Sequence, residues 1–129
     1  MYRPTAWLPL ILALFLLTLP VRAEEPLGRL LVFVNPVCQY CEAFEREVGR
    51  IYAKTPLGER LPIVRVDTLD PPEQYAAQAS RVSFTPTFIV VTPDGHEQAV
   101  FRGYRGEEFF WSELERVARR LGFDPEGSR

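Results

Sequence analysis

The stretch Val37-Cys38-Gln39-Tyr40-Cys41 decides the interpretation of this chain, because it holds the only two cysteines among 129 residues. An unbroken apolar run, Leu30 to Val34, lies just before it. The residues that follow recur at helical spacing: Cys41, Phe44, Val48 and Ile51. This order predicts a buried strand, a tight turn and a helix of about residues 38–54 that begins with the C-x-x-C pair.

The spacing of the two cysteines suits reversible disulfide chemistry. Residues three apart on a helix lie about 5–6 Å from each other, which is within the Cα range that a disulfide tolerates. The sulfur of Cys38 would lie at the helix N-terminus, where unpaired N–H groups and the helix dipole favour a thiolate. Cys41 would lie one turn further in, on the side that faces the core. The pattern therefore indicates a dithiol with an exposed and a buried sulfur.

Two other interpretations of the cysteine pair remain open at this point. The pair could be a structural disulfide, although a loop this short is expected to contribute only about 2 kcal/mol, against about 3 kcal/mol for a 15-residue loop. It could also belong to a zinc site, but structural zinc takes four ligands. The whole chain offers two cysteines and one histidine, His96. We therefore favour redox chemistry and expect no metal.

Residues 1–23 have the pattern of a cleavable secretory signal peptide. Arg3 supplies a positive charge, Leu8 to Leu19 is mostly apolar, and Val21-Arg22-Ala23 places small residues where a signal peptidase cleaves. The alternative is an uncleaved anchor, but twelve residues span only about 18 Å as a helix, and the hydrocarbon core is about 30 Å thick. We expect export and a mature domain of residues 24–129.

The composition of that mature part fits one small exported domain. The chain has 15 basic and 17 acidic residues, and the signal peptide removes Arg3 and Arg22, so the balance becomes 13 − 17 = −4. A mildly acidic chain without a basic block is not expected to bind nucleic acid. Outside the cytoplasm an idle cysteine pair would be oxidised, so a reducing role would need an electron donor.

The rest of the chain alternates between predicted strands and helices. Pro56-Leu57-Gly58 should end the first helical region, and Thr92-Pro93-Asp94-Gly95 should form a hairpin turn. The other predicted elements are a strand at Ile63–Asp67, a short helix at Glu73–Ala79, a strand reaching Ile89–Val91, a strand at Gln98–Arg102 and a helix at Glu107–Leu121. The order β-α-β-α-β-β-α predicts an α/β fold, with a mixed central sheet and helices on both faces.

This pattern resembles the thioredoxin superfamily over about Leu30 to Leu121. Two motifs carry the resemblance: the C-x-x-C at Cys38 to Cys41, and Phe84-Thr85-Pro86-Thr87-Phe88. The family places a cis-proline opposite the cysteines, and in this chain it would be Pro86. The resemblance thus implies a thioredoxin-like fold whose substrate groove includes Thr85 and Pro86, together with the residues between the cysteines, Gln39 and Tyr40.

A narrower resemblance is to the SoxS type, the periplasmic thioredoxin-like proteins of bacterial sulfur-oxidation systems. The residues that suggest it are Thr85-Pro86-Thr87-Phe88, Asp94-Gly95 and, above all, the stretch from Gly103 to Trp111. The chain also departs from thioredoxin itself, because Val32 stands where a buried aspartate relays protons to the second cysteine. Gln39-Tyr40 replaces the Gly-Pro of thioredoxin and the Pro-His of strong oxidants, so we expect a reductase rather than a strong oxidant.

The predicted activity is thiol–disulfide exchange without a cofactor other than the Cys38–Cys41 disulfide. Cys38 would attack an oxidised sulfur of a partner protein, and Cys41 would resolve the mixed disulfide. The resemblance implies a periplasmic reductase that keeps the carrier protein of a sulfur-oxidation pathway reduced. It also implies an electron donor, a membrane thiol transporter of the DsbD or CcdA kind. We expect a monomer.

Two alternatives to this function stay open. One is a general periplasmic thiol reductase, for example for cytochrome c maturation. The other is a binding module or metal carrier of related fold that does not act as an enzyme. Copper sites favour His or Met beside Cys, whereas the one methionine here is Met1 and His96 falls in the predicted hairpin turn. Deprotonation of Cys41 needs a base. Glu42 and Glu45 are close in sequence, but such residues usually form a solvated helix face, and water could serve instead.

Overall fold

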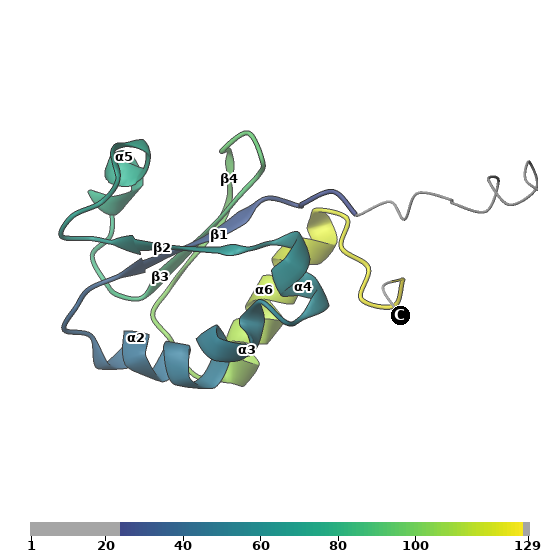
Figure 1. Ribbon diagram of the computed structural model, residues 1–129, viewed down its shortest axis with the longest axis horizontal. Helices are drawn as coiled ribbons and strands as arrows, with labels where there is room; N and C mark the ends of the chain where they lie inside the picture. The colour runs from purple at the N-terminus through teal and green to yellow at the C-terminus, as the bar shows by residue number, and fades with distance from the viewer. Residues whose placement is uncertain (1–23, 128–129) are drawn as a thin grey trace, which may run out of the picture.

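The structure, a computed structural model, describes residues 24–127 of the chain. The predicted signal peptide, residues 1–23, lies outside the described residues. Within residues 24–127 no helix is both long enough and apolar enough to span a bilayer. The described part contains one four-stranded sheet in the order β2-β1-β3-β4 (Figure 1). Its strands are β1 (Arg29–Val34), β2 (Ile63–Asp67), β3 (Thr87–Val91) and β4 (Glu97–Arg102).

The sheet is mixed, as predicted. β1 runs parallel to β2 and antiparallel to β3, and β3 and β4 form an antiparallel hairpin. Leu30 and Val32 of β1 belong to one buried cluster, and Leu31 and Phe33 belong to another on the opposite face. Because both faces of β1 are covered, the strand is apolar throughout rather than alternating.

Helices cover both faces of the sheet (Figure 1). The larger layer is formed by α2, α3, α4 and α6, and α5 lies on the opposite side. The bounds are α2 (Gln39–Phe44), a π-helical segment (Glu45–Gly49), α3 (Arg50–Tyr52), α4 (Pro56–Arg60), a 3-10 turn (Glu73–Tyr75), α5 (Ala76–Ala79) and α6 (Glu107–Arg120). This arrangement confirms the predicted α/β class.

The first helical region differs from the prediction at its C-terminal end. Ile51 was expected on the buried face, but its side chain is 49% exposed, whereas Tyr52 is only 1% exposed. The reason is the π-helical segment, which has more residues per turn than an α-helix and moves the buried position one residue along the chain. The Tyr52 hydroxyl donates a hydrogen bond to the Leu61 carbonyl oxygen, at 2.7 Å.

The residues expected to end this helical region begin another helix instead. Pro56 occupies the first turn of α4, where its missing N–H costs nothing. The Thr55 hydroxyl accepts a hydrogen bond from the Gly58 N–H at 3.0 Å, which makes Thr55 the N-cap. Leu57 is buried and contributes to the core. A proline and a glycine close together therefore mark a helix start here, because a threonine precedes them.

A cluster of aromatic rings fixes α2 against the sheet. The ring centroid of Phe44 lies 5.0 Å from that of Phe88, 5.2 Å from that of Phe110 and 5.7 Å from that of Tyr104. These rings come from α2, β3, α6 and the loop after β4. Tilted and edge-on pairs at such distances are favourable beyond their buried area. The cluster therefore anchors the C-terminal end of α2 on β3 and α6.

Candidate functional site

Cys38 and Cys41 form a disulfide at the start of α2. Their Cα atoms are 5.2 Å apart, as expected for residues on one helical turn. Cys38 is partly exposed and Cys41 is 6% exposed. One sulfur is therefore open to a partner molecule, and the other is sheltered behind it.

Hydrogen bonds at the end of β1 place Cys38 at the helix start. The Asn35 side-chain oxygen accepts from the Val37 N–H at 2.9 Å, which turns the chain after the strand. Cys38 is extended, with φ −148° and ψ 100°, and its Sγ accepts from the Cys41 N–H at 3.1 Å. The Cys38 sulfur thus takes the N-cap role usually filled by an oxygen, where the helix dipole favours negative charge.

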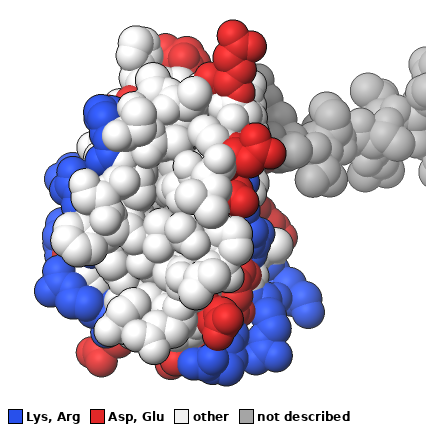
Figure 2. Space-filling view, turned by 90° about the vertical axis from the view of Figure 1, so that its left-hand side faces the viewer, with Lys and Arg blue, Asp and Glu red and all other residues white. Residues whose placement is uncertain are grey.

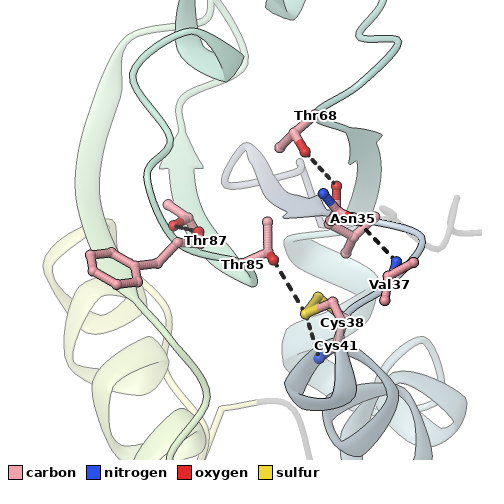
Figure 3. The surroundings of a disulfide bond; sticks show 9 residues. Asn35, Val37, Cys38, Cys41, Thr68, Thr85 and Thr87 are labelled. Atoms are coloured by element: carbon pink, nitrogen blue, oxygen red, sulfur yellow. Dashed lines mark hydrogen bonds between the residues drawn. A yellow bond between two sulfur atoms is a disulfide. The ribbon is translucent and has the colours of Figure 1, made fainter.

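The loop before β3 meets this sulfur from the other side. The Thr85–Pro86 peptide bond is cis, and the Thr85 hydroxyl donates a hydrogen bond to Cys38 Sγ at 3.3 Å (Figure 3). The Pro86 carbonyl oxygen accepts from the Gly103 N–H at 2.8 Å, which ties the loop to the end of β4. The fold therefore brings residues 47 positions apart in the sequence into contact at the disulfide.

The four predicted groove residues do not all line the same cleft. Pro86 is buried, and Gln39 is exposed. Tyr40 and Thr85 line a cleft of about 450 Å³, here called the aromatic cleft. The other large side chains that line it were not predicted as site residues: Phe84, Arg102, Tyr104 and Arg105.

A second hollow lies on the β2 side of the disulfide. Its lining includes Cys38, Cys41, Glu42, Glu45 and Arg65, and its volume is about 350 Å³. Glu45 receives two hydrogen bonds from the Arg65 guanidinium, at 2.5 and 2.8 Å, and these bonds raise the pKa of Arg65. Both candidate bases for Cys41 therefore lie beside the disulfide, with Glu45 already engaged by Arg65.

An apolar residue, Val32, occupies the position at which thioredoxin has its buried aspartate. Val32 is fully buried in the larger core cluster, and it pairs with Arg65 on β2 and with Phe88 on β3. The buried carboxyl route to Cys41 is thus absent at this position.

The surface around the disulfide is mainly uncharged. Val37, beside Cys38, is 92% exposed, and Phe84, beside Thr85, is 66% exposed. Figure 2 shows the end of the molecule at which α2 begins, with a broad uncharged area that has basic side chains on one side and a mixture of acidic and basic side chains on the other. Exposed apolar side chains concentrated in one place indicate a surface that contacts other proteins.

His96 lies in the turn between β3 and β4, as predicted. It is exposed, and its Nε2 is 3.1 Å from Asp94 Oδ2. In the part of the chain that the structure describes, no three or more His, Cys, Asp or Glu side chains come together in a way that could hold a metal ion.

Residues 21–118 match the family model described as a thioredoxin-like domain. The chain belongs to the thioredoxin-like family. This thioredoxin-like protein is similar in structure to the reduced periplasmic thioredoxin SoxS from Paracoccus pantotrophus. The two share 35% identity with a TM-score of 0.62, over 73% of this chain and 95% of the other.

Two further solved structures are similar to this thioredoxin-like protein, with lower sequence identity and lower TM-scores. The thioredoxin from Thermus thermophilus is 25% identical, with a TM-score of 0.55 over 73% of this chain and 75% of the other. The reduced C-terminal domain of DsbD from Neisseria meningitidis is 18% identical, with a TM-score of 0.53 over 73% and 84%, and it supports the fold alone. A search of curated proteins found no match.

Proposed function

We propose that this protein is an exported thiol–disulfide oxidoreductase that reduces oxidised sulfur on partner proteins. The observation that carries the proposal is the disulfide between a partly exposed Cys38, at a helix start, and a buried Cys41. The similarity to a periplasmic thioredoxin supports both the activity and the compartment. The proposed export rests on the signal-peptide pattern of residues 1–23.

The proposed reaction consists of two exchange steps. In the reduced protein the Cys38 thiolate attacks a sulfur of the partner's disulfide, a new S–S bond forms, and the partner's second sulfur leaves as a thiolate. Cys41 then loses its proton and attacks Cys38 Sγ, so the mixed disulfide breaks and the partner leaves fully reduced. Two electrons pass to the partner, and the Cys38–Cys41 disulfide forms.

The surroundings of Cys38 fit a peptide-like substrate. Across residues 24–127, neither the backbone N–H nor the C=O of Thr85 takes part in a hydrogen bond. A partner segment in extended conformation could pair with these groups in the way that a strand adds to a sheet edge. The Thr85 hydroxyl contacts Cys38 Sγ, so a segment paired there would bring its cysteine to the reactive sulfur.

For the natural partner we propose the carrier protein of a sulfur-oxidation pathway, with electrons supplied by a membrane thiol transporter of the DsbD or CcdA kind. The support is the similarity to SoxS and the absence of His between the cysteines. A general reductase for cytochrome c maturation would share the chemistry but not the partner. Mixing the reduced protein with each oxidised partner would separate the two.

Two measurements test the proposed activity. The protein should accelerate insulin reduction by dithiothreitol, and a Cys38→Ser variant should not. The Cys38/Cys41 couple, equilibrated against glutathione, should lie closer to thioredoxin at about −270 mV than to DsbA at about −120 mV. A value near −120 mV would contradict the reductase assignment. No acceleration, with intact partner binding, would favour a binding module.

A further inference from the structure

The aromatic cleft beside the disulfide combines apolar walls with two arginines. Tyr40, Phe84 and Tyr104 supply aromatic rings, and Arg102 and Arg105 supply the charged groups. Thr85, whose hydroxyl contacts Cys38 Sγ, also lines the cleft. Any partner segment that presents a cysteine to Cys38 therefore has the aromatic cleft next to it.

The two arginines of the cleft differ from most others in the described part of the chain. Within residues 24–127 neither Arg102 nor Arg105 forms an ion pair, whereas Arg65 pairs with Glu45 and Arg81 pairs with Glu97. Both cleft arginines are exposed. Their charges are therefore available to an incoming group rather than neutralised within the protein.

Arg105 is also held in place without losing its charge. Its guanidinium carbon lies 4.0 Å from the centre of the Phe109 ring. A guanidinium stacked on an aromatic ring keeps its hydrogen-bond donors free at the edge. Less side-chain freedom is then lost when this group binds a carboxylate.

No carboxylate lines the aromatic cleft. Two acidic side chains act on Tyr104, whose hydroxyl donates a hydrogen bond to Glu47 at 2.5 Å. Burial raises the pKa of Tyr104, and Glu47 and Glu107 raise it further. Glu47 is thus already engaged outside the cleft lining. The cleft itself presents apolar surface and uncompensated positive charge.

We propose that the aromatic cleft selects partner segments that carry an acidic side chain, next to an apolar one, within a few residues of the target cysteine. The planar guanidinium groups match a carboxylate, and the rings match an apolar side chain. This inference rests on the proposed function, because it names the substrate class of the same site.

The test compares three peptides that differ only at one position, two or three residues from a cysteine. This position holds Glu, Gln or Lys, and it is placed on either side of the cysteine in separate series. The cysteine is activated as its mixed disulfide with 2-thiopyridine, a leaving group without charge at neutral pH. Attack by Cys38 on the peptide sulfur releases thiopyridone, which is measured by absorbance.

In one of the two series the Glu peptide should react about threefold or more faster than the Gln peptide at low ionic strength, and the Lys peptide should be slowest. The ratio should approach 1 at about 1 M salt, which screens exposed charges. It should also approach 1 in R102Q/R105Q. Equal rates for all three peptides, or a ratio unchanged in R102Q/R105Q, would overturn the proposal.

A matched control and a second readout separate this inference from the proposed function. Arg116→Gln removes a charge from α6, where Arg116 pairs with Glu113, and it should keep the wild-type Glu-to-Gln ratio. Peptides with Ser in place of Cys measure binding alone, by NMR titration of the oxidised protein. Failure to reduce any activated peptide, with a retained preference for Glu in binding, would refute the redox function and leave the cleft specificity standing.

Discussion

The Thr85 hydroxyl donates a hydrogen bond to the sulfur of Cys38, at 3.3 Å, from the loop that precedes β3. A hydroxyl in this position can also donate to the thiolate of the reduced protein, and hydrogen bonds to a charged group are stronger than those between neutral groups. The side chain of Thr85 is thus placed to favour the reactive form of Cys38, in addition to the backbone groups considered from the sequence.

Thr85→Val should therefore slow the reaction of reduced Cys38 with iodoacetamide at neutral pH. Valine has the shape of threonine without the hydroxyl, so about 1 kcal/mol of thiolate stabilisation is lost. This loss lowers the equilibrium ratio of thiolate to thiol at Cys38 roughly fivefold. Stopped-time alkylation followed by mass spectrometry measures the rate. Thr85→Ser keeps a hydroxyl, so its Cys38 should react at most of the wild-type rate. An unchanged rate in Thr85→Val would show that the bond does not act on the thiolate.

Cys41→Ser should trap a partner protein on Cys38. Serine cannot attack the mixed disulfide, so the covalent complex persists and appears on non-reducing gels. Cys38→Ser is the control and should trap nothing, because Cys41 is buried. Trapping by Cys38→Ser but not by Cys41→Ser would mean that the two sulfurs have the opposite roles.

Phe44→Ala should destabilise the protein by about 3–5 kcal/mol, since it removes a fully buried ring from the centre of the aromatic cluster. Ile51→Ala is the informative control. Its side chain is half exposed, so we expect a loss below about 1 kcal/mol. Urea denaturation of the oxidised proteins gives both values. Similar losses for the two variants would contradict the shifted register of the π-helical segment.

Stability should fall at alkaline pH because of two tyrosines. Burial raises the pKa of Tyr52, and burial with the hydrogen bond to Glu47 raises that of Tyr104. Each hydroxyl keeps its proton in the folded state above about pH 10, where the unfolded chain loses it. The unfolded state then binds fewer protons, so the free energy of unfolding decreases as the pH rises.

Tyr52→Phe should make this decrease shallower by about 1.4 kcal/mol per pH unit above about pH 10. At neutral pH the same variant should be about 1–3 kcal/mol less stable, because the buried Leu61 carbonyl loses the hydroxyl that donates to it. Urea denaturation of the oxidised protein at several pH values gives both effects. A slope equal to that of the wild type would show that Tyr52 titrates alike in both states.

Much of the fold could be predicted from the sequence because its signals are local. The apolar run of β1 and the turn at Thr92-Pro93-Asp94-Gly95 each require only a few neighbouring residues. The same holds for the last helix, where apolar residues recur at intervals of four, three and four: Phe110, Leu114, Val117 and Leu121. The prediction failed at Ile51 and at Pro56, where one residue decides the outcome. A single extra residue in a turn, or the hydroxyl of Thr55 before a proline, changes the structure without changing the overall pattern.

Cys38, Cys41, Tyr40 and Thr85 were predicted as site residues from the sequence, but the other large side chains that line the aromatic cleft were not. Cys38 and Cys41 are separated by only two residues in the sequence, whereas Phe84, Arg102 and Arg105 meet only when β3 and β4 are paired. A charged residue at the end of a strand has no local feature that marks it as part of a cleft. The stretch that starts at Gly103 was noted in the sequence because it resembles the SoxS type. Only the folded structure shows that its first residues line the aromatic cleft beside the disulfide.

The cap at the start of α2 has a consequence for how the protein would pass from one oxidation state to the other. The Cys41 N–H needs an acceptor at the position of Cys38 Sγ, and a thiolate meets that need as well as a bonded sulfur does. Opening the bond would therefore leave this capping interaction in place. Each cycle of the proposed exchange would then begin and end with the same first turn of α2.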